Sequence, residues 1–178
     1  MANILDYLDW RGDLSFSCSP FCEVDNLILS MCCYLNFSGI VSASFDEVRS
    51  FKDVMTDFLN APKELQTLGA IIPGELPVLA RKTALSKRFA GMQVAGFVNE
   101  IDEVKKMQFS ALTYILPDNS LFVAFRGTDD TIVGWKEDFM LVRDLGVKET
   151  GILVSCSDYH IFKKMKMNRR EVMNFYLQ

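Results

Sequence analysis

Hydrophobic residues recur at three- and four-residue spacings through the first half of the chain, which predicts helices. We expect a short first helix that Asn3 caps and that runs through Trp10. Ser19 is expected to cap a second helix, with Pro20 in its first turn, where a missing N–H is harmless. The apolar face of this second helix would comprise Phe21, Val24, Leu27, Ile28, Met31 and Leu35.

Three further helical segments are predicted before residue 90. Ser44 to Glu47 form a capping-box pattern, which opens a helix carrying apolar residues from Val48 to Leu59. Pro62 begins a shorter helical stretch that ends near Gly69, and Pro73-Gly74 breaks the chain again. Leu76 to Phe89 reads as a helix with Pro77 in its first turn.

The pattern changes to strands near residue 92. Met92 to Ile101 is expected to be a strand, with Gly96 as a candidate bulge, and a charged turn at residues 102–106 follows. Phe109–Leu116 and Leu121–Phe125 are apolar and favour strands. Pro117-Asp118-Asn119-Ser120 lies between them, and each of its residues favours a turn, so the two runs should form an antiparallel hairpin.

This order of elements predicts one domain of the α/β class over residues 1–178. Residues 1–90 would form a helical N-terminal region, and residues 91–140 the early strands with a polar loop. Residues 141–178 would form a divergent tail with one strand and one helix. The sheet is expected to be small and mixed or antiparallel.

Composition excludes several classes of protein. With 178 residues, 49% of them hydrophobic, the chain can build a real core. Its net charge of −4 gives no basic footprint for nucleic acid. No apolar run is long enough to span a bilayer, and the N-terminus lacks the features of a signal peptide, so we expect a cytoplasmic protein.

The chain has five cysteines, at positions 18, 22, 32, 33 and 156. Without an export signal they are expected to be reduced thiols, buried or half-buried by default. Zinc sites prefer tighter spacings and a second pair, so we predict no metal site and no cofactor.

The segment after the second hairpin strand carries the candidate chemistry, Arg126-Gly127-Thr128-Asp129-Asp130. Gly127 permits a sharp turn, and Thr128 supplies a backbone N–H beside a hydroxyl. Such a pair can stabilise an oxyanion during acyl transfer. The alternative is a polar turn that holds an Arg–Asp pair. The carboxylate pairs 129–130 and 137–138 have no nameable catalytic partner and are expected to serve as a loop ligand to Arg126 and as a helix-start charge pair.

A lipase-like serine hydrolase that used such an oxyanion hole would also need a nucleophilic serine on a Gly-x-Ser-x-Gly elbow. No two of the ten glycines lie four residues apart, so the elbow is absent from this sequence.

The string FVAFRGTDDTIVGWKEDF resembles the Mbeg1-like (DUF2974) family, bacterial proteins related to α/β-hydrolases and lipases. The opening MANILDYLDWRGDLSF, the later SPF, EVDNLILS and GFVNEID, and the strand at residues 108–116 are also similar to this family. The resemblance covers roughly residues 1–140 and fades after Phe139. It implies an α/β-hydrolase-like fold, helix-rich at its start and incomplete.

The resemblance also implies roles for individual residues. Thr128 would be the oxyanion-hole donor, Gly127 would give the close turn, and Arg126 or Asp129 would order it. Trp135 and Asp138 would brace the loop. The family's nucleophile, acid and histidine cannot be assigned to residues of this chain.

The tail holds a tempting group of residues, Ser155-Cys156-Ser157-Asp158-Tyr159-His160, after an apolar run. Ser157 or Cys156 could act as a nucleophile with His160, the sole histidine, as base. The alternative is a strand end with Asp158 capping a helix from about Tyr159 to Leu177. A nucleophile elbow needs small neighbours, which favours this second interpretation.

Two hypotheses for function follow. In the first, the chain is the N-terminal part of a lipase- or esterase-like hydrolase that acts on acyl esters, and this part alone is inactive. It would then be a shortened or frame-altered gene product or a small variant. Alternatively, it is a non-enzymatic binding or assembly protein that uses an exposed sheet edge to add a strand, including from a second copy of itself.

Overall fold

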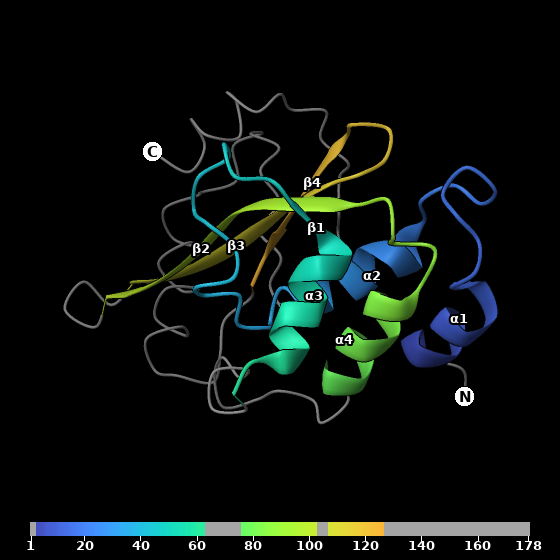
Figure 1. The fold of residues 1–178 in the computed structure, drawn as a ribbon, viewed down its shortest axis with the longest axis horizontal. Coiled ribbons are helices and arrows are strands. Elements are labelled where there is room, and N and C mark those ends of the chain that lie inside the picture. Colours follow the sequence, from blue (N-terminus) through green and yellow to red (C-terminus); the bar gives the residue numbers. More distant parts are fainter. Residues whose placement is uncertain (1–2, 63–75, 103–106, 127–178) are drawn as a thin grey trace, which may run out of the picture.

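The structure is a computed structural model that describes residues 3–62, 76–102 and 107–126. Within these ranges, helices cover one face of an antiparallel sheet (Figure 1). The helices are α1 (Ile4–Arg11), α2 (Glu23–Cys32), α3 (Phe51–Asn60) and α4 (Leu76–Leu85). The strands are β1 (Arg49–Ser50), β2 (Gln93–Asp102), β3 (Met107–Ile115) and β4 (Leu121–Phe125). The mixed α/β class and the antiparallel sheet are therefore confirmed.

The sheet has the order β1-β2-β3-β4, so each described strand pairs with the next one in sequence. β3 and β4 form the predicted hairpin, in register from Ile115 opposite Leu121 to Ala111 opposite Phe125. The predicted turn between them is also confirmed. Asn119 takes a left-handed φ of 61°, which asparagine tolerates, and Asp118 accepts from the Ser120 N–H at 2.9 Å.

A β-bulge interrupts β2 at the predicted glycine. The register between β2 and β3 shifts between Ala95 and Val98, and Gly96 has a φ of +64°. The Phe45 ring lies directly on Gly96, so that a Cβ there would clash with the ring. The position therefore requires glycine for its backbone and for its neighbour.

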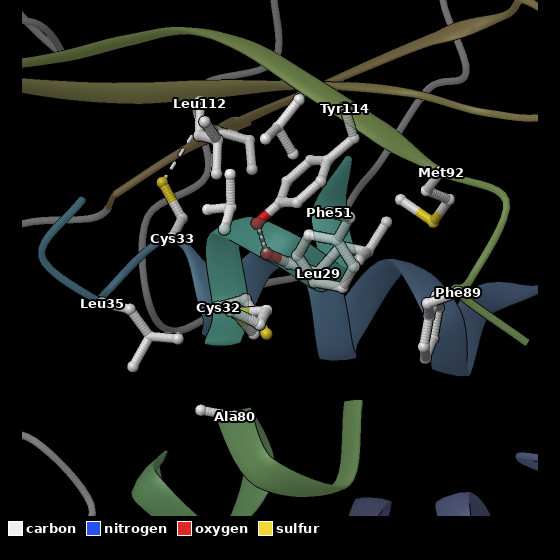
Figure 2. Close-up of a cluster of buried hydrophobic side chains, with 14 of the residues drawn as sticks. Leu29, Cys32, Cys33, Leu35, Phe51, Ala80, Phe89, Met92, Leu112 and Tyr114 are labelled. Atoms are coloured by element: carbon white, nitrogen blue, oxygen red, sulfur yellow. Dashed lines mark hydrogen bonds between the residues drawn. The ribbon is translucent and has the colours of Figure 1, made fainter. Parts of the chain in front are cut away.

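The main core lies between the helices and the sheet. Figure 2 shows part of it, with the Tyr114 hydroxyl of β3 donating to the Leu29 carbonyl of α2 at 3.0 Å. Phe37, Phe51, Phe58 and Phe89 are fully buried in this layer. On the opposite face of the sheet, Phe45 packs with a smaller apolar cluster of Ala95, Ile115 and Leu121.

Several predicted helix boundaries were wrong. The first helix agrees, with Asn3 accepting from the Leu5 and Asp6 N–H groups. The second begins at Glu23 rather than after Ser19, because the Ser19 and Pro20 carbonyls instead accept from the Arg88 guanidinium. Asp25 accepts from the Cys22 N–H at this helix start.

The third helix also begins later than predicted. Ser44 caps only a local turn, where its hydroxyl accepts from the Asp46 N–H, and Ser50 caps α3. The intervening Arg49–Ser50 pairs with β2 as the short strand β1. The last predicted helix ends at Leu85 rather than Phe89. The helical stretch expected from Pro62 to Gly69 lies almost wholly outside the described residues.

One buried ion pair holds the N-terminal segment to the body of the protein. Both side chains of Arg88 and Asp25 are fully buried, and two guanidinium nitrogens donate to the two carboxylate oxygens at 2.6 Å each. The same guanidinium donates to the Leu14 carbonyl at 3.1 Å and lies over the Phe16 ring, 4.6 Å from its centroid. Every strong donor on this buried charge is thus used.

Candidate functional site

The candidate site begins where β4 ends. Leu121, Phe122 and Ala124 are buried and Val123 is half-buried, as the unbroken apolar run predicted. The hairpin register continues one residue past Phe125, since the Arg126 N–H donates to the Ser110 carbonyl at 2.9 Å. This bond holds the backbone of Arg126 beside β3.

A polar row crosses the sheet at this point. Asn99 of β2 is paired with Ser110 of β3, and Arg126 lies beyond Ser110 on the β4 side. Ser110 is only 2% exposed. Within the described residues, the Ser110 hydroxyl and the Asn99 side-chain oxygen are buried and make no hydrogen bond. Two polar atoms without partners thus stand beside the residue that opens the candidate loop.

The residue that follows α2 contacts β4 close to the candidate site. Cys33, which follows α2, donates through its thiol to the Ala124 carbonyl at 3.3 Å. Burial raises the pKa of Cys33 to about 12, although the nearby positive charge of Arg126 acts in the opposite direction. The thiol is therefore neutral at physiological pH and acts as a donor, not as a nucleophile.

The sulfur atoms of the neighbouring pair point apart. Cys32 lies on the α4 side, where its pKa is also raised to about 12 by burial and Thr83 makes a hydrogen bond to it. Cys18 and Cys22 are exposed, so the expectation of buried or half-buried thiols was wrong for these two. Hydrogen bonds from Ser15 and Ser17 lower the pKa of Cys18. No group of three or more metal-ligating side chains occurs in the described part of the chain.

Most of the predicted site residues lie outside the described residues. Of the four assigned to the loop, Arg126 alone is described, and it is half-buried. Its pairing with Asp129, the oxyanion role of Thr128 and the turn at Gly127 remain predictions. So do the nucleophile and base assigned to Ser157 and His160, and the strand and helix of the tail.

Sequence reasoning missed the companions of Arg126. Ser110 is a polar residue in an apolar strand, and counting the hairpin register from either turn would have placed it beside Arg126 and Asn99. Cys33 was assigned to the second helix, but nothing in its sequence neighbourhood indicates a contact with a residue 91 positions away.

Comparison with known proteins bears on this same stretch. Residues 83–151 match the model of the Mbeg1-like family. The predicted family resemblance is thereby confirmed, over a segment that runs from the end of α4 through β2, β3 and β4 and past the candidate loop. We call these residues the Mbeg1-like segment. The match ends twelve residues beyond Phe139, and it does not include residues 1–82.

Two curated relatives share short stretches with this chain. One is a citrate (Re)-synthase of Clostridium kluyveri, 69% identical over 42 residues, which are 24% of this chain and 9% of the enzyme. The other is a citrate (Re)-synthase of Syntrophus aciditrophicus, 52% identical over 50 residues, 26% of this chain and 8% of the enzyme. The chain thus spans less than a tenth of each relative. No solved structure matches the chain. Within the described residues, no helix is both long and apolar enough to cross a membrane.

Proposed function

We propose that this chain is a relative of lipase- and esterase-like serine hydrolases that keeps the oxyanion side of the site and lacks the nucleophile. The observation that carries the proposal is the position of the Arg126-Gly127-Thr128 sequence, directly after a buried strand of the Mbeg1-like segment. The ligand class is an acyl ester, whose carbonyl oxygen would accept from Thr128. Because no Gly-x-Ser-x-Gly elbow is present, the chain alone is expected to give at most residual hydrolysis.

Labelling with a fluorophosphonate probe tests the absence of a nucleophile. The full chain is expected to stay unlabelled, beside an active serine hydrolase as positive control. Labelling that disappears in Ser157→Ala or His160→Ala would overturn the proposal and make the tail an active site.

Ligand binding tests the oxyanion side separately. Titration of the folded chain with a fluorinated short-chain acyl ester, followed by fluorine NMR, is expected to broaden the ester signal. Thr128→Val should weaken this effect, and Ser157→Ala should leave it unchanged. An ester signal that no concentration of the protein alters would refute a retained oxyanion site.

The strand-addition hypothesis concerns β4, the last strand in the described order. No other described strand pairs with its outer side. The binding function, including self-assembly through a sheet edge, stays the prediction made from sequence, and it ranks second because the family resemblance favours the hydrolase-related function.

The stretches shared with the two citrate (Re)-synthases cover less than a tenth of each enzyme, and they support no transfer of the activity in that name to this chain.

A further inference from the structure

Three polar residues lie side by side across β2, β3 and the end of β4. Ser110 of β3 is paired with Asn99 of β2, and from the other side the Arg126 N–H donates to the Ser110 carbonyl at 2.9 Å. Residues directly opposite each other on neighbouring strands have Cβ atoms about 4.5–5.5 Å apart. The three side chains are therefore neighbours on one face of the sheet, and we call Asn99, Ser110 and Arg126 the polar row.

The polar row faces the helices. Side chains alternate between the two faces of a strand, so residues two positions apart share a face. The residues two positions from the row on its three strands all lie in the main core: Phe97, Leu112 and Ala124. Burial raises the pKa of Cys33, which follows α2, and the charge of Arg126 acts against this effect, so the guanidinium lies on the same side. The row is therefore the polar border of the main core.

The row holds hydrogen-bonding capacity that the described part of the chain does not use. Ser110 is 2% exposed, and neither its hydroxyl nor the buried side-chain oxygen of Asn99 has a partner there. No ion pair among the described residues includes Arg126. The carboxylate next to the row in sequence, Glu100, alternates to the opposite face of β2. A polar group buried without a partner costs stability, so this row is better explained by a ligand than by folding.

The three groups of the row differ in the ligand atoms that they can bind. The Arg126 guanidinium only donates, and its planar fork matches a carboxylate. The Ser110 hydroxyl can donate to the same carboxylate. The Asn99 side-chain oxygen only accepts, so it requires a donor on the ligand. The row carries one positive charge, which a single carboxylate balances.

We propose that the polar row binds the carboxylate end of a small α-hydroxy acid. The carboxylate would accept from Arg126 and Ser110, and the hydroxyl on the adjacent carbon would donate to Asn99. An α-amino acid fits less well, because its ammonium group would lie close to the charge of Arg126. A phosphate group fits less well, because its charge approaches −2 and the row supplies one cation.

The test is an NMR titration of the nitrogen-15-labelled full chain with glycolate, the smallest α-hydroxy acid, and with acetate, which lacks the hydroxyl. Glycolate is expected to shift the side-chain amide signal of Asn99 and the Nε–H signal of Arg126 until both saturate. Acetate should bind about fivefold more weakly, because one hydrogen bond is missing. Neither ligand is an ester, so this result is independent of the tests of the hydrolase-related function, which assigns Arg126 only to the order of the loop.

Three variants separate the contributions of the row. Arg126→Gln should weaken the binding of both ligands by about tenfold or more, because the charge that holds the carboxylate is lost. Ser110→Ala should weaken both about fivefold. Asn99→Ala should weaken glycolate to the level of acetate and leave acetate unchanged. Arg81→Gln, which replaces an exposed arginine of α4, is the matched control and should bind both ligands as the unaltered chain does.

Three results would overturn the proposal, each with the samples shown to be folded by circular dichroism. The first is the absence of any shift of the Asn99 and Arg126 side-chain signals at high glycolate concentration. The second is equal affinity of the unaltered chain for glycolate and acetate, because the hydroxyl would then have no partner. The third is glycolate binding that appears only in an Asp129→Asn variant, because the row would then serve the chain's own carboxylate.

Discussion

The guanidinium of Arg88 binds the carboxylate of Asp25 through two hydrogen bonds of 2.6 Å, with both side chains fully buried. The two residues are 63 positions apart, and they join the start of α2 to the turn after α4. The hydrogen bonds that the guanidinium donates to Asp25, more than any other cause, raise the pKa of Arg88, so this side chain stays charged at every physiological pH. Tyr7 also donates to Asp25, at 3.2 Å.

Asp25→Asn is expected to destabilise the protein by about 3–5 kcal/mol, because it leaves a buried guanidinium without its counter-charge. Asp57→Asn is the matched control. It breaks an exposed ion pair, between Asp57 and Arg49 at 2.7 Å, and should cost about 0–1 kcal/mol. Urea denaturation measures both. An equal loss of stability in the two variants would show that the buried ion pair stabilises the fold no more than the exposed one does.

Gly96→Ala is expected to cost more than a positive φ alone would explain. The left-handed backbone costs about 1–2 kcal/mol for an alanine, and contact with the Phe45 ring adds about 1–3 kcal/mol. Gly39→Ala separates the two effects, because Gly39 has a φ of +75° and nothing within 4 Å of the added Cβ. Gly96→Ala should therefore lower the free energy of unfolding more than Gly39→Ala does, by the cost of the contact with the Phe45 ring. Combining Gly96→Ala with Phe45→Ala should restore part of the loss, and strictly additive costs would argue against that contact.

Stability is expected to fall as the pH rises above about 9. The pKa of Cys33 is 9.0 in its ordinary state and about 12 in the folded protein. Between these values the unfolded state releases the proton first, so the folded state loses stability with rising pH. Cys32, Tyr7 and Tyr114 act in the same direction, because burial raises the pKa of each.

The measurement for this prediction is the slope of unfolding free energy against pH between pH 8 and pH 11, as those pKa directions imply. Cys33→Ala should make the slope less steep without abolishing it. Cys18→Ser should not, because Cys18 is exposed and its pKa is lowered rather than raised. A Cys33→Ala slope identical to that of the unaltered chain would contradict the assignment.

Ser110→Ala is expected to change stability by less than about 0.5 kcal/mol or to increase it, because the hydroxyl is buried without a hydrogen bond. Ser86→Ala provides the comparison. Its hydroxyl donates to Gly12 at 2.9 Å, and its removal should cost about 1–2 kcal/mol. Thermal and chemical denaturation measure the free energy of unfolding of both variants. A loss at Ser110 as large as the loss at Ser86 would mean that its hydroxyl has a partner in solution.

Local signals predicted the sheet well. Three signals are local, because each affects only the backbone within a few residues of its own position. They are the Pro117–Ser120 turn, the apolar run from Leu121 and the glycine at position 96. Capping patterns were less reliable. Ser19 and Ser44 are good caps by type, but the chain near Ser19 is held by Arg88, and the chain after Ser44 is drawn into β1. Tertiary contacts outweigh a cap worth about 1 kcal/mol.

Long-range pairings could not be predicted from one sequence. Arg88 follows Ser86 and Lys87 in a polar stretch, where charged side chains are usually exposed, yet it is only 1% exposed. The surroundings of Arg126 have the same origin. Ser110, which accepts from its N–H, is on β3, Asn99 is paired with Ser110 from β2, and Cys33, on whose pKa the charge of Arg126 acts against the larger effect of burial, follows α2. The type and position of residues such as Thr128 indicate a chemistry, but the shape of a site is made by residues that carry no local signal.

The order of strands has a consequence for how the chain folds. Since β2, β3 and β4 pair as successive hairpins, each pairing closes only a short loop and loses little chain entropy. The strands can therefore pair one after another, in the order in which the ribosome synthesises them. The link from α2 to α4 through Asp25 and Arg88 closes a much longer loop. We expect the hairpins to form early in folding and the helical layer to lock onto them last.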